Sequence, residues 1–467
     1  MTQTVGGAVD ALREAVSGAV LVPGDVDYDE ARTVWNAAID RRPAVIARCR
    51  DSADVAAAVR VGVEHGLEIA VRGGAHGISG KAVVDDGLMI DLSGMNSVAV
   101  DPDARRVRAG GGTLLADMIA ATEEHGLATP VGLIGHTGVG GLTLGGGMGW
   151  LTRKYGLSID NLVSAEVVTA DGQVRRASTA EHPDLFWAIR GGGGNFGVVT
   201  EFEFALHPVG PIVQVALLFW ELDRGGDVLR LARELGGALP AEINMVAAGL
   251  NAPPAPFVPT EHQLKPGYGF IVVGFGAPEE HEELVNQIRE ALPPLWDFVT
   301  PMPYLDLNQM LDEDNRWGQY GYDKGGQIAE ITDDVIDAVT QRFPRKQSPG
   351  SVVLFYRVDG AYSRVPDDET AYAGERSPGW YVFTIGLCPT ADMLPAEQEW
   401  VRGLHSALAP QMVTRTYVNV VEEDNSDIAA AYGSEKYTRL ARIKAVYDPT
   451  NVFHRNANIY PAAQHTT

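Results

Sequence analysis

The 467-residue sequence predicts an α+β fold built in more than one part, and three observations support this prediction. Short strands and helices alternate through the first 208 residues. After Pro208 the expected strands become longer and amphipathic helices separate them, which is typical of an antiparallel sheet with helices on one face. The residues from 412 onward again give a short strand and a helix. A chain of this length also favours two or more domains.

Turn and stop signals divide the first part of the chain. Ser52 is expected to cap a helix that ends at Gly66, since glycine adopts the conformation that closes a helix. Asp171-Gly172 lies between two alternating apolar runs, which is a strong hairpin signal. The expected strands are 44–49, 67–71, 88–92, 106–109 and 198–206, and the further helices are 114–125 and 183–190.

Apolar periodicity also predicts strands and helices in the second part of the chain. Its expected strands are 213–222, 268–275, 351–359 and 380–387, and its expected helices are 227–235, 279–292, 333–343 and 396–408. In the closing part we expect a strand at 415–421 and a helix at 434–447. Asp448-Pro449 ends that helix, because proline cannot continue it.

Composition excludes several classes of partner. The net charge of −24 should repel nucleic acid and anionic lipid. The two cysteines, Cys49 and Cys388, are too few for a disulfide scaffold, and no Cys/His spacing indicates a metal site. No apolar run is as long as a membrane span, and the N-terminus lacks the basic start of a signal peptide. We therefore expect a cytoplasmic protein, with its oligomeric state left open.

Three glycine-rich segments are the candidate binding loops. Segment 72–80 (RGGAHGISG) follows a strand, and the backbone N–H groups of such a turn suit a pyrophosphate. His76 in its middle would face a cofactor or be an ordinary loop histidine. Segment 192–197 (GGGNFG) matches GxGxxG by letter, but a helix precedes it and a strand follows, which argues against a nicotinamide Rossmann site. Segment 138–150 (GVGGLTLGGGMGW) is the densest and favours cofactor contact.

Taken together, these segments resemble those of a known enzyme family. The matching set also includes 151–157 (LTRKYGL), Asp160-Asn161, 184–187 (DLFW), 417–419 (YVN), Tyr432-Gly433 and 437–458. In this order they resemble FAD-linked oxidases of the berberine bridge enzyme type, which belong to the vanillyl-alcohol oxidase group. The resemblance covers nearly the whole chain. It implies a PCMH-type FAD-binding domain in two pieces, 1–208 and 412–467, with the substrate domain 209–411 inserted between them.

The resemblance also implies the cofactor contacts. His76 aligns with the histidine that bonds the flavin 8-methyl group, and Ala75 stands where glycine is more usual. Ile134 aligns with the cysteine that forms a second link in many relatives, so we expect one covalent link to FAD. His136 would either line the flavin or be an ordinary loop histidine. The other expected contacts are Arg72, Gly73, Gly74, Ala75, Gly77, Gly80, Thr137, Gly138, Gly141, Thr143, Gly147, Gly194, Val199, Tyr417, Asn456 and Asn458.

The implied activity is that of an oxidase. Such an enzyme takes a hydride from a C–H next to oxygen or nitrogen in a small organic substrate, and O2 reoxidises the flavin to give H2O2. Thr137 and Val139 are smaller than leucine and should leave room for O2. Two alternatives stay open: a dehydrogenase of the same fold that uses another electron acceptor, and a flavin-bearing binding protein without turnover.

Proton removal from the substrate needs a base, and tyrosines are the candidates. Tyr417 comes first, with Asn419 facing the same way on an alternating strand. Further candidates from the substrate domain are Tyr320, Tyr322 and Tyr356. Val420 and Ile78 replace tyrosines that plant relatives often carry. We therefore expect a drier pocket that favours a substrate less polar than a free sugar.

Overall fold

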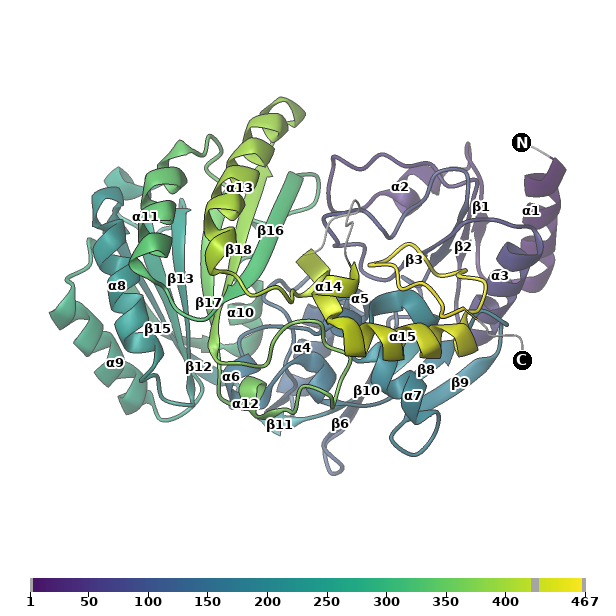
Figure 1. The fold of residues 1–467 in the computed structure, drawn as a ribbon, viewed down its shortest axis with the longest axis horizontal. Coiled ribbons are helices and arrows are strands. Elements are labelled where there is room, and N and C mark those ends of the chain that lie inside the picture. Colours follow the sequence, from purple (N-terminus) through teal and green to yellow (C-terminus); the bar gives the residue numbers. More distant parts are fainter. Residues whose placement is uncertain (1–2, 421–427, 464–467) are drawn as a thin grey trace.

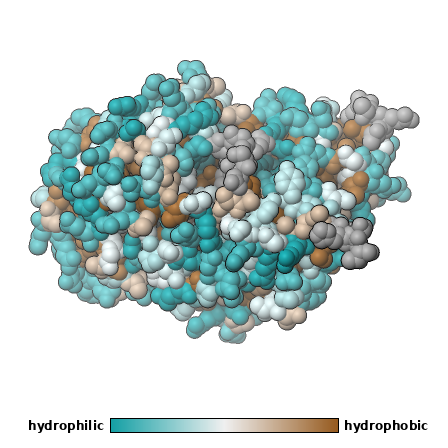
Figure 2. All heavy atoms as spheres, in the orientation of Figure 1, coloured by the Kyte–Doolittle hydropathy of each residue, from teal (hydrophilic) through white to brown (hydrophobic). Residues whose placement is uncertain are grey.

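The computed structural model describes residues 3–420 and 428–463, and its two halves are unlike each other (Figure 1). One half holds a seven-stranded sheet with helices on its outer face, and the other holds the smaller sheets and both chain ends. Hydrophilic side chains cover most of the face shown in Figure 2, and the apolar residues on it are scattered in small groups. Within the described residues, no helix is long and apolar enough to cross a membrane.

A small sheet near the N-terminus carries the first glycine loop. Its elements are α1 (Gln3–Ala15), β1 (Val20–Leu21), α2 (Tyr28–Arg32), β2 (Val45–Arg48), α3 (Ser52–Glu64), β3 (Ile69–Arg72) and β4 (Leu88–Asp91). Strands β2, β4 and β3 lie side by side in parallel, and β1 pairs with β2 in the antiparallel sense. Asp51 caps α3, and Ser52 does not, because the Asp51 carboxylate accepts a hydrogen bond from the backbone N–H of Asp54 (2.9 Å).

A five-stranded antiparallel sheet completes the first part of the chain. Its order is β5-β6-β10-β8-β9, and the hairpin predicted at Asp171-Gly172 is confirmed between β8 and β9. The elements are β5 (Val98–Asp101), β6 (Arg106–Gly110), α4 (Leu115–Glu123), α5 (Val139–Gly145), α6 (Thr152–Tyr155), β8 (Leu162–Val168), β9 (Val174–Ser178), α7 (Pro183–Ile189) and β10 (Val198–Ala205). Segment 192–197 lies after α7 and before β10, so the helix-then-strand order that argued against a Rossmann site is confirmed.

The large sheet has seven antiparallel strands in the order β15-β12-β14-β13-β17-β18-β16. Its strands are β12 (Ile212–Glu221), β13 (Ile243–Asn251), β14 (Pro266–Gly274), β15 (Trp296–Pro303), β16 (Tyr320–Ile328), β17 (Val352–Val358) and β18 (Gly379–Cys388). Helices cover its outer face (Figure 1): α8 (Gly225–Gly236), α9 (Pro278–Ala291), α11 (Asp333–Arg342) and α13 (Leu394–Leu408). Along β17, Val353 and Phe355 pack under the helices, while Leu354 and Tyr356 face the other half of the molecule.

Three strands of this sheet were not predicted, namely β13, β15 and β16. The sequence of β13 is a nearly continuous apolar run without alternation, because both of its faces are buried. Pro301 and Pro303 argue against a strand at β15, because proline cannot donate a backbone hydrogen bond. An edge strand such as β15 tolerates proline, since one side of its backbone needs no partner. The other edge strand, β16, has the sequence YGYDKGGQI, and its glycines and charged residues interrupt the alternation of apolar and polar residues that would indicate a strand.

The closing part differs from the prediction at one point. Residues 415–417 lie outside any helix or strand, and 418–420 form a single 3-10 turn. The prediction of a strand at 415–421 is therefore wrong for residues 415–420, and Val421 lies outside the described residues. The Tyr417 backbone N–H donates to the Tyr381 hydroxyl (2.9 Å) instead of to a neighbouring strand. The predicted helix is confirmed as α15 (Ser434–Tyr447), which follows α14 (Ile428–Tyr432).

Candidate functional site

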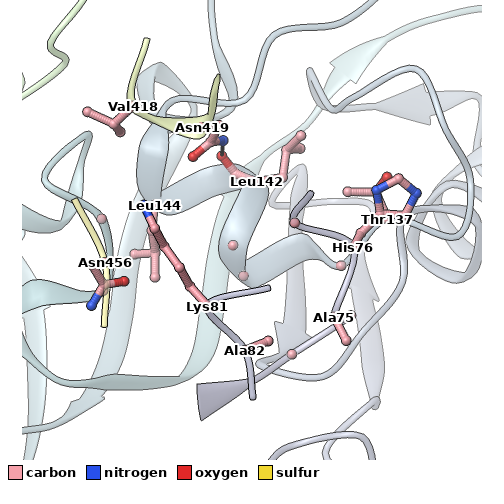
Figure 3. A pocket seen from close by; sticks show the side chains of 18 of the residues that line it. Ala75, His76, Lys81, Ala82, Thr137, Leu142, Leu144, Val418, Asn419 and Asn456 are labelled. Carbon is pink, nitrogen blue, oxygen red and sulfur yellow. Dashed lines mark hydrogen bonds between the residues drawn. The ribbon is translucent and has the colours of Figure 1, made fainter. Parts of the chain in front are cut away.

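A cavity of about 460 Å³ lies where the inner face of the large sheet meets the loops of the other half. The loop after β3, the segment around α5, the segment before β10 and residues from 417–420 and 453–457 line it. Figure 3 shows His76 and Thr137 at one end, Asn456 at the opposite end, and Val418 and Asn419 along one side. Sites for small molecules and cofactors typically measure roughly 300–1,000 Å³.

The structure brings most of the predicted site residues to this one cavity. Those that line it are Gly73, Gly74, Ala75, His76, Gly77, Thr137, Gly138, Gly141, Gly194, Val199, Tyr356, Tyr417, Asn419 and Asn456. Those that lie outside its lining are Arg72, Gly80, Thr143, Gly147, Asn458, Tyr320 and Tyr322. Val139, predicted to leave room for O2, is fully buried in the core behind the lining.

Backbone contact between two glycines fixes the distance between the His76 loop and α5. A Cβ on Gly74 would lie 2.3 Å from the backbone nitrogen of Gly138, and a Cβ on Gly138 would lie 2.3 Å from the backbone nitrogen of Gly74. Neither position has room for a side chain. Ala75, next in the loop, has a φ of +52°, a left-handed conformation that glycine adopts at lower cost. This conformation explains why glycine suits that position better.

The predicted residues outside the lining support the cavity from behind. Arg72 donates to the backbone carbonyl of Thr33, and its Nε lies 3.6 Å from a carboxylate oxygen of the buried Asp91, so its guanidinium faces away from the cavity. Thr143 is buried within α5, and Gly80 ends the loop. The carbonyl oxygen of the Asn458 side chain is buried and has no hydrogen-bond partner among the described residues.

His76 lies between two other aromatic rings. Its ring centroid is 5.0 Å from that of Trp35, which is stacked on it, and 4.9 Å from that of His136. Burial, and secondly the charge of His136, lowers the pKa of His76 to about 3, so His76 is neutral near pH 7. Its Nε2, and both ring nitrogens of His136, are buried without a hydrogen-bond partner in the described part of the chain. A buried neutral imidazole of this kind retains a lone pair that can form a covalent bond.

The Tyr417 hydroxyl lies in the wall of the cavity and accepts two hydrogen bonds. The donors are the backbone N–H of Gly147 (3.1 Å) and the side-chain amide of Asn419 (2.8 Å). Burial raises the pKa of Tyr417 above its usual value, while these two hydrogen bonds act in the opposite direction by stabilising the ionised form. The Asn419 amide also donates to the Leu142 carbonyl (3.1 Å), which fixes its orientation.

The tyrosines of the large sheet have other roles. The Tyr356 ring lines the cavity, but its hydroxyl donates to the Gly149 carbonyl and accepts from the Asn244 amide (2.9 Å), so it joins the sheet to the glycine-rich segment. The Tyr322 hydroxyl accepts from Arg402 of α13 (2.9 Å) on the outer face of the sheet. Tyr320 faces the same way by strand alternation. The structure therefore does not support the prediction that Tyr320 or Tyr322 supplies the base.

The end of the cavity next to the large sheet is mostly apolar. Phe383 and Ile385 of β18 line it there, and Val420 lies beside Gly325 of β16. Further apolar side chains of the cavity lining are Leu133, Ile134, Leu142 and Val418. Sequence reasoning missed Phe383, Ile385 and Asp323, which lie on β18 and β16, and it also missed the basic residues Lys81 and Arg455. Lys81 directly follows the His76 loop and Arg455 directly precedes Asn456, so closeness to predicted contacts was the available signal.

These features fit an FAD cofactor and define the class of the protein. His76 is neutral, and its buried Nε2 has no hydrogen-bond partner among the described residues. Gly74 and Gly138 beside it carry no side chains, so the backbone there can approach a cofactor closely. The fold and the site are those of an FAD-dependent oxidoreductase.

Comparisons with known proteins agree with this class. Residues 43–178 match the FAD binding domain family, and residues 416–460 match the family described as berberine and berberine like. The chain is 31% identical over 466 residues to (R)-6-hydroxynicotine oxidase of Paenarthrobacter nicotinovorans, covering 96% of this chain and 97% of the relative. The chain therefore belongs to the berberine bridge enzyme-like family of FAD-linked oxidoreductases, as the sequence predicted.

Two solved structures are similar in fold. One is 6-hydroxy-D-nicotine oxidase from Arthrobacter nicotinovorans, with a TM-score of 0.84 and 28% identity over 95% of this chain and 98% of that one. The other is glucooligosaccharide oxidase from Acremonium strictum, described with a 6-S-cysteinyl, 8α-N1-histidyl FAD. It has a TM-score of 0.85 and 24% identity over 99% of this chain and 100% of that one. The predicted mixed α+β fold with a PCMH-type FAD-binding domain is confirmed.

Proposed function

We propose that the protein oxidises a C–H bond next to oxygen or nitrogen in a small organic substrate and passes the electrons to O2, which leaves as H2O2. FAD supplies the two-electron acceptor for this reaction when it is bound. The observation that carries the proposal is that one cavity contains the neutral His76, the hydroxyl of Tyr417 and apolar side chains of the large sheet. The apolar lining supports a substrate less polar than a free sugar.

We further propose a single covalent link, through His76. Ile134 lines the cavity at the position that aligns with the second linking residue of relatives, and no cysteine is among the described lining residues. Cys49 is buried in the core around α1 and α3, and Cys388 is buried at the end of β18. Burial raises the pKa of both thiols, that of Cys388 to about 11, which keeps them protonated and unreactive near pH 7.

In this proposal Tyr417 handles the substrate proton. The N–H groups of Gly147 and Asn419 stabilise negative charge on its oxygen and so oppose the rise in pKa that burial causes. It is the ionised form of Tyr417, which these two donors favour, that would accept a proton from the substrate. Asn419 acts as a positioning residue, because it holds the Tyr417 hydroxyl from one side and the Leu142 carbonyl from the other. Tyr356 is less suited to this role, since its hydroxyl already bonds to Gly149 and Asn244.

Anaerobic reduction followed by admission of air separates the oxidase from its alternatives. Holoenzyme is mixed without O2 with a panel of amines, alcohols and sugars, and bleaching of the flavin is followed. An oxidase bleaches with at least one compound, then turns yellow rapidly in air and releases H2O2. Reoxidation over many minutes would indicate a dehydrogenase, and the absence of bleaching with every compound would indicate a binding protein.

Thr137 provides a matched variant for the oxygen step. Its side chain lines the cavity at the end where His76 lies (Figure 3). Thr137→Leu narrows that end, so it should slow the return of colour in air and leave the anaerobic bleaching rate nearly unchanged. Equal reoxidation rates in both proteins would show that O2 reaches the flavin by another route.

A further inference from the structure

Trp35 is stacked on the His76 ring. The two ring centroids lie 5.0 Å apart with an interplanar angle of 22°, and Trp35 is buried, with 2% of its surface exposed. His136 lies at a similar distance from His76, 4.9 Å, but its ring is tilted by 34°. Trp35 therefore makes the more nearly parallel contact with the His76 imidazole.

The orientation of the His76 ring depends on this contact. The torsion that turns an imidazole about its Cβ bond has broad minima, so it does not fix the ring by itself. Nε2 of His76 has no hydrogen-bond partner among the described residues that would hold it. The plane of the imidazole is therefore restrained mainly by the neighbouring rings.

The indole of Trp35 is itself held by residues next to the large sheet. Its ring N–H donates to the Asn315 carbonyl (2.6 Å), and the Trp35 backbone carbonyl accepts from the Gly318 N–H (3.2 Å). A Cβ built on Gly321 would lie 3.0 Å from Cζ3 of the indole, so the edge of the ring lies directly against this glycine. These contacts come from the chain between α10 (Tyr304–Gln309) and the first residues of β16.

Trp35 also bonds to the loop that carries His76. Its backbone N–H donates to the carbonyl of Ala75 (3.0 Å), the residue before His76. The neighbouring Asn36 donates to the Ile78 carbonyl (2.7 Å) on the other side of His76 and bonds to Gly321 as well. A displacement of the large sheet would therefore move the indole, and with it the His76 imidazole.

We propose that Trp35 is the positioning residue for covalent attachment of FAD to His76, and that residues 315–321 of the large-sheet half hold Trp35 in place for this reaction. The inference rests on the covalent link proposed above. In the attachment reaction one hydrogen leaves the flavin 8-methyl group and one leaves the imidazole, and a C–N bond forms between the two groups. The flavin takes up the two electrons set free, and O2 then removes them together with two protons as H2O2.

The rate of attachment tests the proposal. Each protein is produced in cells starved of riboflavin, purified as apoprotein and mixed with FAD in air. Samples are precipitated in acid and washed at intervals, and the flavin that stays in the pellet is measured per protein. Reversible binding of FAD is measured separately, from the quenching of flavin fluorescence before attachment proceeds.

Trp35→Leu should bind FAD and attach it roughly 10- to 100-fold more slowly than the native protein. The reason is that a misplacement of about 1 Å in a reacting group can lower a rate by roughly 10²-fold. Trp35→Phe keeps an aromatic ring on His76 and should recover most of the rate, although it loses the bond to Asn315. Trp35→Met replaces Trp35→Leu if the latter yields no folded protein, because an unbranched side chain fills an irregular space more readily.

Trp220→Leu is the matched control. Trp220 is also a buried tryptophan, its indole N–H donates to the Leu292 carbonyl (3.1 Å), and it packs in the core under the outer helices of the large sheet. Its Tm should fall as that of Trp35→Leu does, while its rate of attachment should stay native. Equal rates in the native protein and Trp35→Leu, or equal slowing in the two leucine variants, would overturn the proposal.

Gly321→Val tests the contribution of the large sheet without a change in Trp35. Its side chain would press on the edge of the indole, so attachment should slow. A native rate in this variant would overturn the part assigned to residues 315–321.

The same assay keeps this proposal apart from the covalent link. If the native protein attaches flavin and Trp35→Leu does so equally fast, the positioning role is wrong and the link through His76 stands. If the native protein forms no acid-stable flavin, the link is wrong and the positioning role falls with it. The oxidase function is decided separately, by the release of H2O2 after anaerobic bleaching.

Discussion

Removing the Tyr417 hydroxyl separates its chemical role from its structural role. In Tyr417→Phe the ring keeps its place beside Tyr372 and Tyr381, whose centroids lie 5.9 and 6.0 Å away. The Gly147 N–H loses its 3.1 Å acceptor and stays buried, whereas the exposed Asn419 amide can bond to water. One unsatisfied buried N–H costs about 1–3 kcal/mol.

Two separate readouts follow from this substitution. The structural cost corresponds to a fall in Tm of roughly 2–12 °C, at about 2–4 °C per kcal/mol for a unit of some 200 residues. The loss of a positioned base should slow anaerobic flavin reduction by roughly 10²- to 10⁴-fold, with FAD still bound. Stopped-flow reduction and thermal unfolding of the same preparation measure both effects.

Tyr356→Phe is the matched control for this experiment. It also removes a buried hydroxyl from the cavity wall, with the loss of bonds to Gly149 and Asn244, so its Tm should fall by a similar amount. Its reduction rate should change far less. A loss of less than about threefold in Tyr417→Phe, or equal slowing in both variants, would refute the assignment of Tyr417 as the base.

Three further predictions use other features of the structure. Gly74→Ala should yield protein with little FAD, measured by the flavin-to-protein absorbance ratio, because its Cβ would lie 2.3 Å from the Gly138 nitrogen. Asp160→Asn should lower the urea unfolding free energy by about 3–5 kcal/mol, since it leaves Arg376 buried without its carboxylate (2.7 Å). Burial lowers the pKa of His76 to about 3, so below about pH 6.5 the unfolded chain binds a proton that the folded apoprotein does not. The unfolding free energy of the apoprotein should therefore be at its full value above about pH 6.5 and fall toward pH 3. The expected loss at about pH 5 is up to about 2 kcal/mol. The His76→Gln apoprotein should lose less in the same urea titrations, and equal losses would contradict this account.

The sequence predicted the site better than it predicted the sheet that faces the site. The glycine loop around His76 and the Tyr417-x-Asn419 unit were singled out because, in order with the other segments, they resemble the motifs of a known enzyme family; spacing alone left His76 open. Asp323 was missed together with β16, since that strand carries glycines and charges and has no alternation that marks it. Tyr322 was named as a candidate base although its side chain faces away from the cavity. The strand that carries it was not recognised, and a sequence alone does not show which face of such a strand meets a cavity.

Long-range contacts account for the remaining differences. Trp35 stacks on His76, and Asn36 donates one hydrogen bond to Ile78 of the His76 loop and forms two more with Gly321 of β16. Both residues lie some 40 residues before the loop in a segment without a motif. The strand expected at 415–421 fails in its described part because the Tyr381 hydroxyl, 36 residues earlier, takes the Tyr417 N–H. Local propensity cannot anticipate partners that only the folded chain brings together.

The most direct test of this account is the site of flavin attachment. The protein is precipitated in acid, washed, digested and mapped for flavin-bearing peptides, alongside His76→Ala and the control His136→Ala. We expect a yellow pellet and one flavin peptide, the one that contains His76, with the flavin lost from the pellet of His76→Ala and kept by His136→Ala. A colourless pellet from the native protein, or a flavin peptide that contains Cys49 or Cys388, would contradict the account.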